Sequence, residues 1–169
     1  MTMRNQGAEN WYSNLDELVN MEYDYDVVMK DTTIHAHSMI YVDIPLHKSY
    51  LVYVDKTVAK NNPRRNLKVY PDQTVKVTRK DGSNIVVGNP TDSCWLFKVV
   101  RGKINLYSQL SQTKGLDDSY IKAYQVGESG PVVKIDSASL ADIVRNDVKA
   151  SKLVSKKSYY QAILTYNGK

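Results

Sequence analysis

Short runs of alternating apolar and polar residues fill the middle of the chain. In Tyr50–Val58, Leu51 and Tyr53 fall on one face of an extended strand, and Val52 and Val54 fall on the other. Comparable runs predict further strands at Tyr25–Met29, Ile34–Ile44, Leu67–Tyr70, Thr74–Arg79, Asn84–Val87, Trp95–Val100, Lys103–Ser108, Tyr120–Val126 and Val132–Ile135. Together they predict an antiparallel β-sheet or a partial barrel from about Tyr23 to Ile135.

Turns that contain glycine predict how neighbouring strands pair. Asp81–Gly82 joins two β-rich runs, and the longer loop Gly127–Pro131 joins two more. The strongest hairpin signal is Arg101–Gly102, in the middle of the β-rich stretch Trp95–Ser108. We expect Gly102 to supply the positive φ that a tight turn requires.

The pattern becomes helical after Ile135. Ser137 or Ser139 is expected to cap a first helix, and Val148–Val154 is expected to form a second. In the last segment apolar residues recur at i, i+3, i+4 and i+7, namely Tyr159, Ala162, Ile163 and Tyr166. A helix of this length is marginal alone in water, so we expect its apolar stripe to pack on the rest of the protein.

Many strands followed by helices predict an α+β fold rather than an alternating parallel one. The length of 169 residues suits one domain. We divide it into an N-terminal segment at 1–22, partly helical over Asn14–Met21, a β-rich domain at 23–135, and a helical C-terminal segment at 136–169 packed on the same domain.

Composition is that of an ordinary globular protein, with 42% hydrophobic and 24% charged residues. The only cysteine, Cys94, lies in an apolar run and is expected to be a buried, inert thiol. No apolar run approaches the roughly 20 residues that span a bilayer, so we expect no transmembrane segment. Residues 1–10 are polar and lack the apolar stretch of a secretory signal. A periplasmic or secreted location therefore requires that a signal was removed, and the alternative is the cytoplasm.

The formal net charge is +5, and the charge is unevenly placed along the chain. The first stretch is acidic, whereas the middle carries Lys56, Lys60, Arg64, Arg65, Lys68, Lys76, Arg79 and Lys80. This basic middle region makes an anion or nucleic-acid binder one alternative function. The only aromatic residue within its central stretch is Tyr70, too few for single-strand binding by base stacking, so we expect no nucleic-acid partner.

Tyrosine dominates the aromatic residues, with 13 tyrosines against one phenylalanine and two tryptophans. A tyrosine ring packs while its hydroxyl stays in water, which suits half-buried strands or a contact surface. The candidate ligand-binding residues are therefore Tyr41, Tyr50 and Tyr53, with Arg64 and Arg65. The partner that these residues suggest is a protein or a glycan.

His35 and His37 are the candidate metal ligands. Residues i and i+2 of a strand share a face, so two imidazoles there could chelate one ion, with His47 joining across a turn. The alternative function that they suggest is a metal-dependent hydrolase. A catalytic zinc site needs three protein ligands, however, and no HExxH or Cys/His framework is present. No phosphate loop, dinucleotide fingerprint or nucleophile elbow occurs either, so we assign no catalytic residue and expect no cofactor.

Two stretches carry a resemblance to a known group of proteins. These are Ser93–Tyr107, with its Cys-Trp-Leu-Phe run, and Lys152–Asn167, with its Tyr-Tyr-Gln-Ala-Ile run. Together they resemble uncharacterised exported proteins of Bacteroidota, in which a β-rich region precedes a short helical end. The resemblance covers about the last half of the chain and implies an envelope or secreted location, but it implies no activity. The function that we expect is a non-enzymatic binding or interaction module of the bacterial cell envelope.

Overall fold

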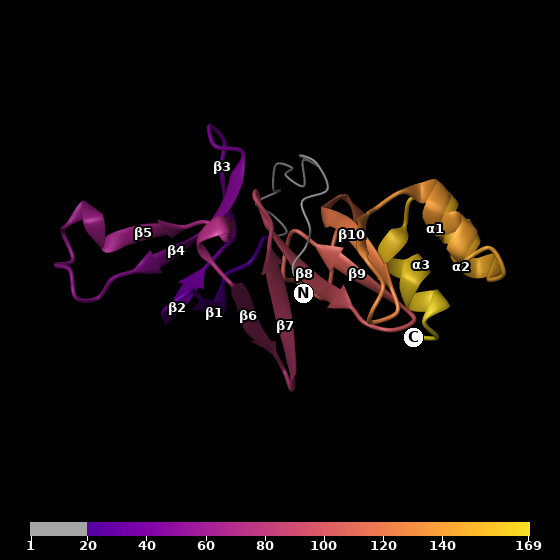
Figure 1. The fold of residues 1–169 in the computed structure, drawn as a ribbon, viewed down its shortest axis with the longest axis horizontal. Coiled ribbons are helices and arrows are strands. Elements are labelled where there is room, and N and C mark those ends of the chain that lie inside the picture. The colour runs from indigo at the N-terminus through magenta and orange to yellow at the C-terminus, as the bar shows by residue number, and fades with distance from the viewer. Residues whose placement is uncertain (1–19) are drawn as a thin grey trace. The chain divides into compact units, whose positions relative to one another are not determined.

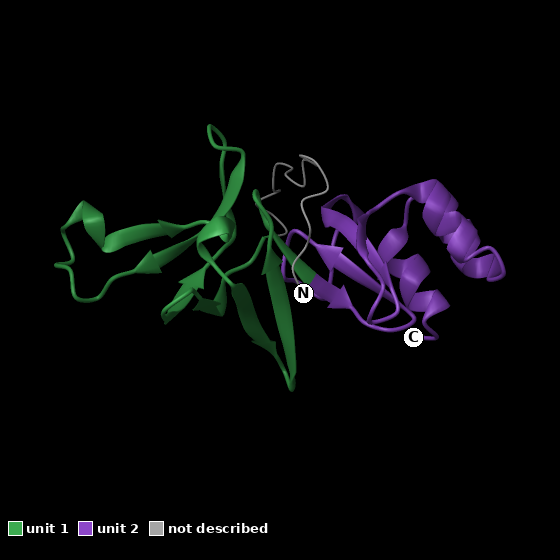
Figure 2. Cartoon of the chain, in the orientation of Figure 1, with its two compact units in different colours: residues 1–97 green, residues 98–169 purple. Residues whose placement is uncertain are grey.

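The computed structural model of the protein describes residues 20–169. The chain divides into two compact units, residues 1–97 and residues 98–169 (Figure 2). The boundary lies inside β8 (Trp95–Val100), and each unit is described by itself. The predicted helix at Asn14–Met21 lies almost entirely outside the described residues, and the segment boundaries at 23 and 136 stay predictions.

Hydrogen bonds join the strands into two sheets (Figure 1). The larger sheet has eight strands in the order β11-β10-β9-β8-β7-β6-β1-β2, and the smaller sheet has three in the order β3-β4-β5. Every strand pair with an assigned register is antiparallel. Three helices follow the last strand. The predicted α+β fold, mostly antiparallel with a helical C-terminus, is therefore confirmed.

Within its described residues, 20–97, the first unit contains seven complete strands and two 3-10 helices. The strands are β1 (Tyr23–Val28), β2 (Thr33–Ser38), β3 (Tyr41–Asp43), β4 (Lys48–Val54), β5 (Asn66–Val69), β6 (Lys76–Asp81) and β7 (Asn84–Pro90). The 3-10 helices are η1 (Pro63–Arg65) and η2 (Pro71–Gln73). The predicted hairpin at Asp81–Gly82 is confirmed, since β6 and β7 pair around it and Gly82 has a φ of 61°.

The single strand predicted at Ile34–Ile44 is wrong, because extended structure is interrupted between the end of β2 at Ser38 and the start of β3 at Tyr41. At this interruption the Ser38 hydroxyl donates a hydrogen bond to the carbonyl of Met39 (2.6 Å) and accepts one from the amide of Val52 (3.0 Å). A serine side chain that takes main-chain partners competes with the regular ladder. The residues on either side therefore enter different sheets, β2 the larger one and β3 the smaller one.

The core of the first unit is built around aromatic side chains. Trp95, Tyr25 and Phe97 are all at most 1% exposed. The Trp95 indole donates to the Thr74 hydroxyl (2.9 Å), so its polar atom is satisfied inside the core. A Cβ on Gly88 would lie 2.5 Å from the Phe97 ring, so only glycine leaves room for that ring.

The second unit holds the rest of the larger sheet, followed by three helices. Its elements after β8 are β9 (Ile104–Ser108), η3 (Asp118–Tyr120), β10 (Ile121–Val126), β11 (Val132–Lys134), α1 (Ser137–Ile143), α2 (Val148–Ser155) and α3 (Tyr159–Tyr166). As the apolar stripe predicts, Ala162 and Ile163 are fully buried. The predicted caps of α1 are wrong, because the Asp136 carboxylate caps it by accepting the amide of Ser139 (2.9 Å).

The turn at Gly102 corrects one part of a prediction and confirms another. β8 and β9 are neighbours in the sheet, as the hairpin signal predicts. The expected positive φ at Gly102 is wrong, because the described glycines with positive φ are Gly82, Gly115, Gly127 and Gly168. Gly102 is instead needed for close packing, since a Cβ there would lie 2.5 Å from Cγ of Asn167.

Candidate functional site

One face of the three-stranded sheet carries a row of tyrosines. Tyr41 on β3 lies opposite Tyr50 on β4, and their rings stack with centroids 5.3 Å apart and planes 21° apart. Tyr70, the first residue after β5, places its ring centroid 5.9 Å from that of Tyr50. Cross-strand aromatic pairs stabilise antiparallel sheets. We call Tyr41, Tyr50 and Tyr70 the tyrosine face.

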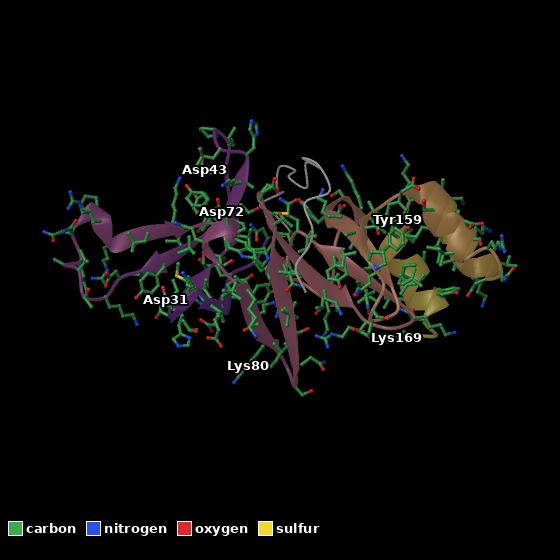
Figure 3. The ribbon with its side chains drawn as sticks, viewed as in Figure 1. Asp31, Asp43, Asp72, Lys80, Tyr159 and Lys169 are labelled. Atoms are coloured by element: carbon green, nitrogen blue, oxygen red, sulfur yellow. The ribbon has the colours of Figure 1, made fainter. Side chains whose placement is uncertain are left out.

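Charged groups fix the tyrosine face in place. The Lys68 ammonium lies 4.5 Å from the Tyr50 ring centroid and 2.9 Å from Oδ2 of Asp43. The Tyr70 hydroxyl donates to that same carboxylate oxygen (2.8 Å). The Asp43 side chain, labelled in Figure 3, is only 10% exposed. One carboxylate thus holds a cation and a phenol on the same side of the sheet.

The protonation states follow from these contacts. Hydrogen bonds from Lys68 and from Tyr70 hold the pKa of Asp43 below its usual value. The bond to Asp43 raises the pKa of Lys68. Burial, together with the hydrogen bond to Asp43, raises the pKa of the Tyr70 phenol. At neutral pH the carboxylate and the ammonium are therefore charged and the phenol keeps the proton that it donates.

The turn between β3 and β4 exposes large apolar side chains beside the tyrosine face. Ile44 is 68% exposed and Leu46 is 55% exposed, and we call these two residues the β3–β4 tip. The turn is held from its base, because the amide of Leu46 donates to Oδ1 of Asp43 (3.4 Å) and the amide of His47 donates to the carbonyl of Ile44 (3.2 Å). The tip therefore presents apolar surface to water on an ordered turn.

Of the five predicted ligand-binding residues, the structure brings only Tyr41 and Tyr50 together. Tyr53 follows Tyr50 by three positions, so it lies on the opposite face of β4, where it pairs across strands with Leu67. Arg64 and Arg65 belong to η1, in the loop that joins the far ends of β4 and β5 (Figure 1). The five residues do not form one site.

Sequence reasoning missed Asp43, Lys68 and Tyr70. Asp43 and Lys68 are 25 positions apart, and Asp43 and Tyr70 are 27 apart. No local motif links them, since each is an ordinary residue of a short strand or its end. The β4–β5 register, in which Val52 faces Lys68, is the information that places Lys68 near Tyr50.

The candidate metal ligands His35 and His37 each pair with a carboxylate of β1. His37 lies opposite Asp24 in the register and its Nδ1 is 2.8 Å from Oδ1 of Asp24, while Nε2 is 3.6 Å from the Glu22 carboxylate. His35 lies opposite Asp26 and makes the equivalent contact. Asp24, with a smaller contribution from Glu22, raises the pKa of His37.

These side chains form an exposed ladder of imidazoles and carboxylates at the edge of the larger sheet. Within residues 20–169, no group of three or more His, Cys, Asp and Glu side chains is arranged to hold a metal ion. His47 belongs to the β3–β4 turn, not to this ladder. The metal-dependent hydrolase therefore gains no third ligand from the described part of the chain.

Comparison with known proteins yields no match to a family model, a curated protein or a solved structure. None of the helices within residues 20–169 combines the length and the apolar character needed to cross a membrane.

Proposed function

We propose that the protein is a non-enzymatic binding module that contacts a protein partner through the β3–β4 tip and the adjoining tyrosine face. The observation that carries the proposal is the exposure of Ile44 and Leu46 on a turn that Asp43 holds at its base. Exposed apolar side chains next to tyrosines, with a charged rim, are the composition of protein–protein contact surfaces.

Hydrogen bonds and ion pairs that hold the tip and the tyrosine face in one conformation support this proposal. Asp43 bonds to Lys68, to Tyr70 and to the amide of Leu46, so one residue couples the tip to the tyrosine face. Lys48, which faces Asp43 across β3 and β4, pairs with Asp72 of η2. A surface held in one conformation before binding loses less conformational entropy on association.

A protein partner fits the geometry better than a glycan does. Sugars stack on free aromatic faces, whereas the Tyr50 ring already has the Tyr41 ring stacked on it and the Lys68 ammonium over it. Ile44 and Leu46 offer aliphatic surface, which complements a hydrophobic patch of a protein rather than hydroxyl groups.

We further propose a location at the cell envelope, which rests on the resemblance of Ser93–Tyr107 and Lys152–Asn167 alone. Fractionation of the source cells with an antibody against the protein tests this location. Recovery of the protein in the cytoplasmic fraction alone would contradict it.

The proposed contact surface is tested by capture with matched baits. The wild-type protein and the double variant Ile44→Asp, Leu46→Asp are immobilised and exposed to an extract of the source cells. The control bait is Val75→Asp, Ile85→Asp, which makes the same change at two residues that are 57% and 55% exposed elsewhere in the first unit.

We expect the wild-type and control baits to capture the same protein from the extract. The tip variant should capture at least about tenfold less of it. Calorimetric titration of the purified partner must give the same order, with the wild type and the control binding more tightly than the tip variant. Equal capture by all three baits, or no reproducible capture by the wild type, contradicts the proposal. Binding of a glycan by the wild type that Tyr41→Ala abolishes would favour the glycan instead.

A further inference from the structure

The loop that joins β4 to β5 is strongly basic. Residues 55–65 contain four basic residues and one acidic residue. The pairing of β3 with β4 ends at Tyr50, and beyond it β4 and β5 form a two-stranded antiparallel ribbon, with Val54 facing Asn66 where the loop begins and ends. The two strands are labelled β4 and β5 in Figure 1, and the loop connects their ends at the left of the picture.

Internal hydrogen bonds order this loop. The Asp55 carboxylate accepts both the amide (2.9 Å) and the hydroxyl (2.6 Å) of Thr57. The Asn62 side chain accepts the amide of Arg64 (2.9 Å) and caps η1. Arg65 donates through its guanidinium to the carbonyl of Val58 (2.8 Å), and its own carbonyl accepts the amide of Asp55 (2.8 Å). One acidic and one basic side chain are thus used to fix the loop.

The remaining three cations are gathered on this one loop and leave it positively charged, since its single acidic residue, Asp55, is used in the loop's own hydrogen bonds. Lys56, Lys60 and Arg64 are exposed, and no acidic side chain within residues 20–169 forms an ion pair with them. The lysines of the neighbouring tyrosine face differ, since Lys48 pairs with Asp72 and Lys68 pairs with Asp43.

We propose that this loop binds the phosphate backbone of double-stranded nucleic acid through Lys56, Lys60 and Arg64. Phosphate contacts supply most of the affinity of such binding and are independent of base sequence. A two-stranded ribbon has the width that the major groove of DNA admits, so the fold allows the loop to lie against both flanking backbones.

The composition of the loop favours double-stranded nucleic acid over single strands and over an anionic lipid surface. Residues 55–65 hold no aromatic side chain on which unpaired bases could stack, which disfavours single strands. Their only apolar side chains are Val58, Ala59 and Pro63, which give too little apolar surface to enter a lipid bilayer. The scarcity of aromatic residues in the basic region therefore argues against single strands but not against a duplex.

Fluorescence anisotropy with a labelled 20-base-pair DNA duplex of arbitrary sequence, titrated from about 50 to 200 mM salt, tests the proposal. The test variant is Lys56→Gln, Lys60→Gln, Arg64→Gln. The matched control is Lys149→Gln, Lys152→Gln, Lys156→Gln, which removes the same charge from three exposed positions around α2. All the changed side chains are exposed, and a thermal melt of each variant checks that it is folded.

We expect the loop variant to bind at least about tenfold more weakly than the wild type in 50 mM salt. Its slope of log affinity against log salt should be shallower by about 2–3, because each lost phosphate contact removes about 0.9. The control should keep the wild-type slope.

Three outcomes would overturn the proposal. Equal losses in the two variants would mean general attraction by net charge. Tighter binding to the single strand of the same length would exclude the duplex as the preferred ligand. If the wild type binds vesicles containing about 30% anionic lipid as tightly as it binds the duplex, and the loop variant loses this binding, the loop would be assigned to a membrane surface.

Discussion

Asn167, at the end of α3, holds the main chain of Ile104 with both atoms of its side-chain amide. Its Oδ1 accepts the amide of Ile104 (3.0 Å) and its Nδ2 donates to the carbonyl of Ile104 (2.9 Å). This is the paired donor and acceptor that a neighbouring strand would otherwise offer to the first residue of β9. The C-terminal helix is therefore joined to the sheet by polar contacts as well as by its apolar stripe.

The first prediction concerns the dependence of this contact on Gly102. A Cβ at Gly102 would lie 2.5 Å from Cγ of Asn167, so Gly102→Ala displaces the amide and leaves the Ile104 groups unpaired. We expect Gly102→Ala and Asn167→Ala each to lower the free energy of unfolding by about 1–3 kcal/mol. In the Asn167→Ala background, Gly102→Ala should cost less than about 0.5 kcal/mol. Urea unfolding of the four proteins gives this double-mutant cycle.

Gly127→Ala is the control for that cycle. Gly127 has a φ of 66° and no atom lies within 4 Å of a Cβ built there, so its cost comes from the backbone alone. That cost should be the same with and without Asn167. An equal cost of Gly102→Ala in the two backgrounds would show that Asn167 is not what Gly102 accommodates.

The second prediction concerns the apolar side of α3. Ile163 is fully buried, and truncating a buried isoleucine removes transfer free energy and leaves a cavity. We expect Ile163→Ala to lower the free energy of unfolding by at least about 1.5 kcal/mol, whereas Lys157→Ala, at an exposed position, should stay within about 0.5 kcal/mol. Denaturant melts of both variants decide this. Equal, negligible effects would mean that the helix does not contribute to the fold.

Elements whose signals are local could be predicted from the sequence. The β6–β7 hairpin follows from the turn residues Asp81–Gly82, and α3 follows from the spacing of its apolar residues. Asp136 precedes Ser137 and Ser139, the two predicted caps of α1. Both residue types suit the N-cap position, so propensity alone does not choose among the three residues.

The candidate site depends instead on which strands become neighbours. Nothing near Asp43 in the sequence indicates Lys68 or Tyr70, because the contact requires the registers of β3 with β4 and of β4 with β5. The reason for glycine at position 102 is also tertiary, since Asn167 approaches it from 65 positions away. Periodicity and turn rules describe single elements, and these contacts join several.

The third prediction uses a difference between the ends of α2 and α3. After α3, Gly168 has a φ of 79°, the amide of Lys169 donates to Leu164 and the amide of Gly168 donates to Thr165. After α2 the same two bonds form, from Ser158 to Leu153 and from Lys157 to Val154, but here Lys157 adopts the positive φ, at 59°. This C-terminal motif favours glycine at that position because a Cβ is strained there.

We therefore expect Lys157→Gly to raise the free energy of unfolding by about 0.5–1 kcal/mol. Lys156→Gly, one residue earlier at the C-cap of α2, has no positive φ to relieve and should give no such gain. Thermal or urea melts compare the two variants. A loss of stability in Lys157→Gly would mean that the lysine side chain contributes more than its backbone strain costs.

The fourth prediction concerns stability at alkaline pH. The Tyr107 side chain is buried in the second unit, and its hydroxyl donates to Oε1 of Gln125 (2.8 Å). Burial, assisted by the Glu128 carboxylate, raises the pKa of Tyr107 to about 12. The phenol of an unfolded chain ionises near pH 10, so between about pH 10 and 12 the folded protein holds a proton that the unfolded chain has released.

Because the unfolded state binds fewer protons in that range, stability falls as the pH rises. The contribution of Tyr107 is fully present below about pH 10 and is lost progressively up to about pH 12. Other groups also titrate there, so the measured quantity is the difference in free energy of unfolding between the wild type and Tyr107→Phe, from urea melts at pH 8, 9, 10 and 11. We expect this difference to be constant at pH 8 and 9 and to shift against the wild type at pH 10 and 11. A difference that stays constant across all four pH values would show that the Tyr107 phenol ionises alike in the folded and unfolded chains.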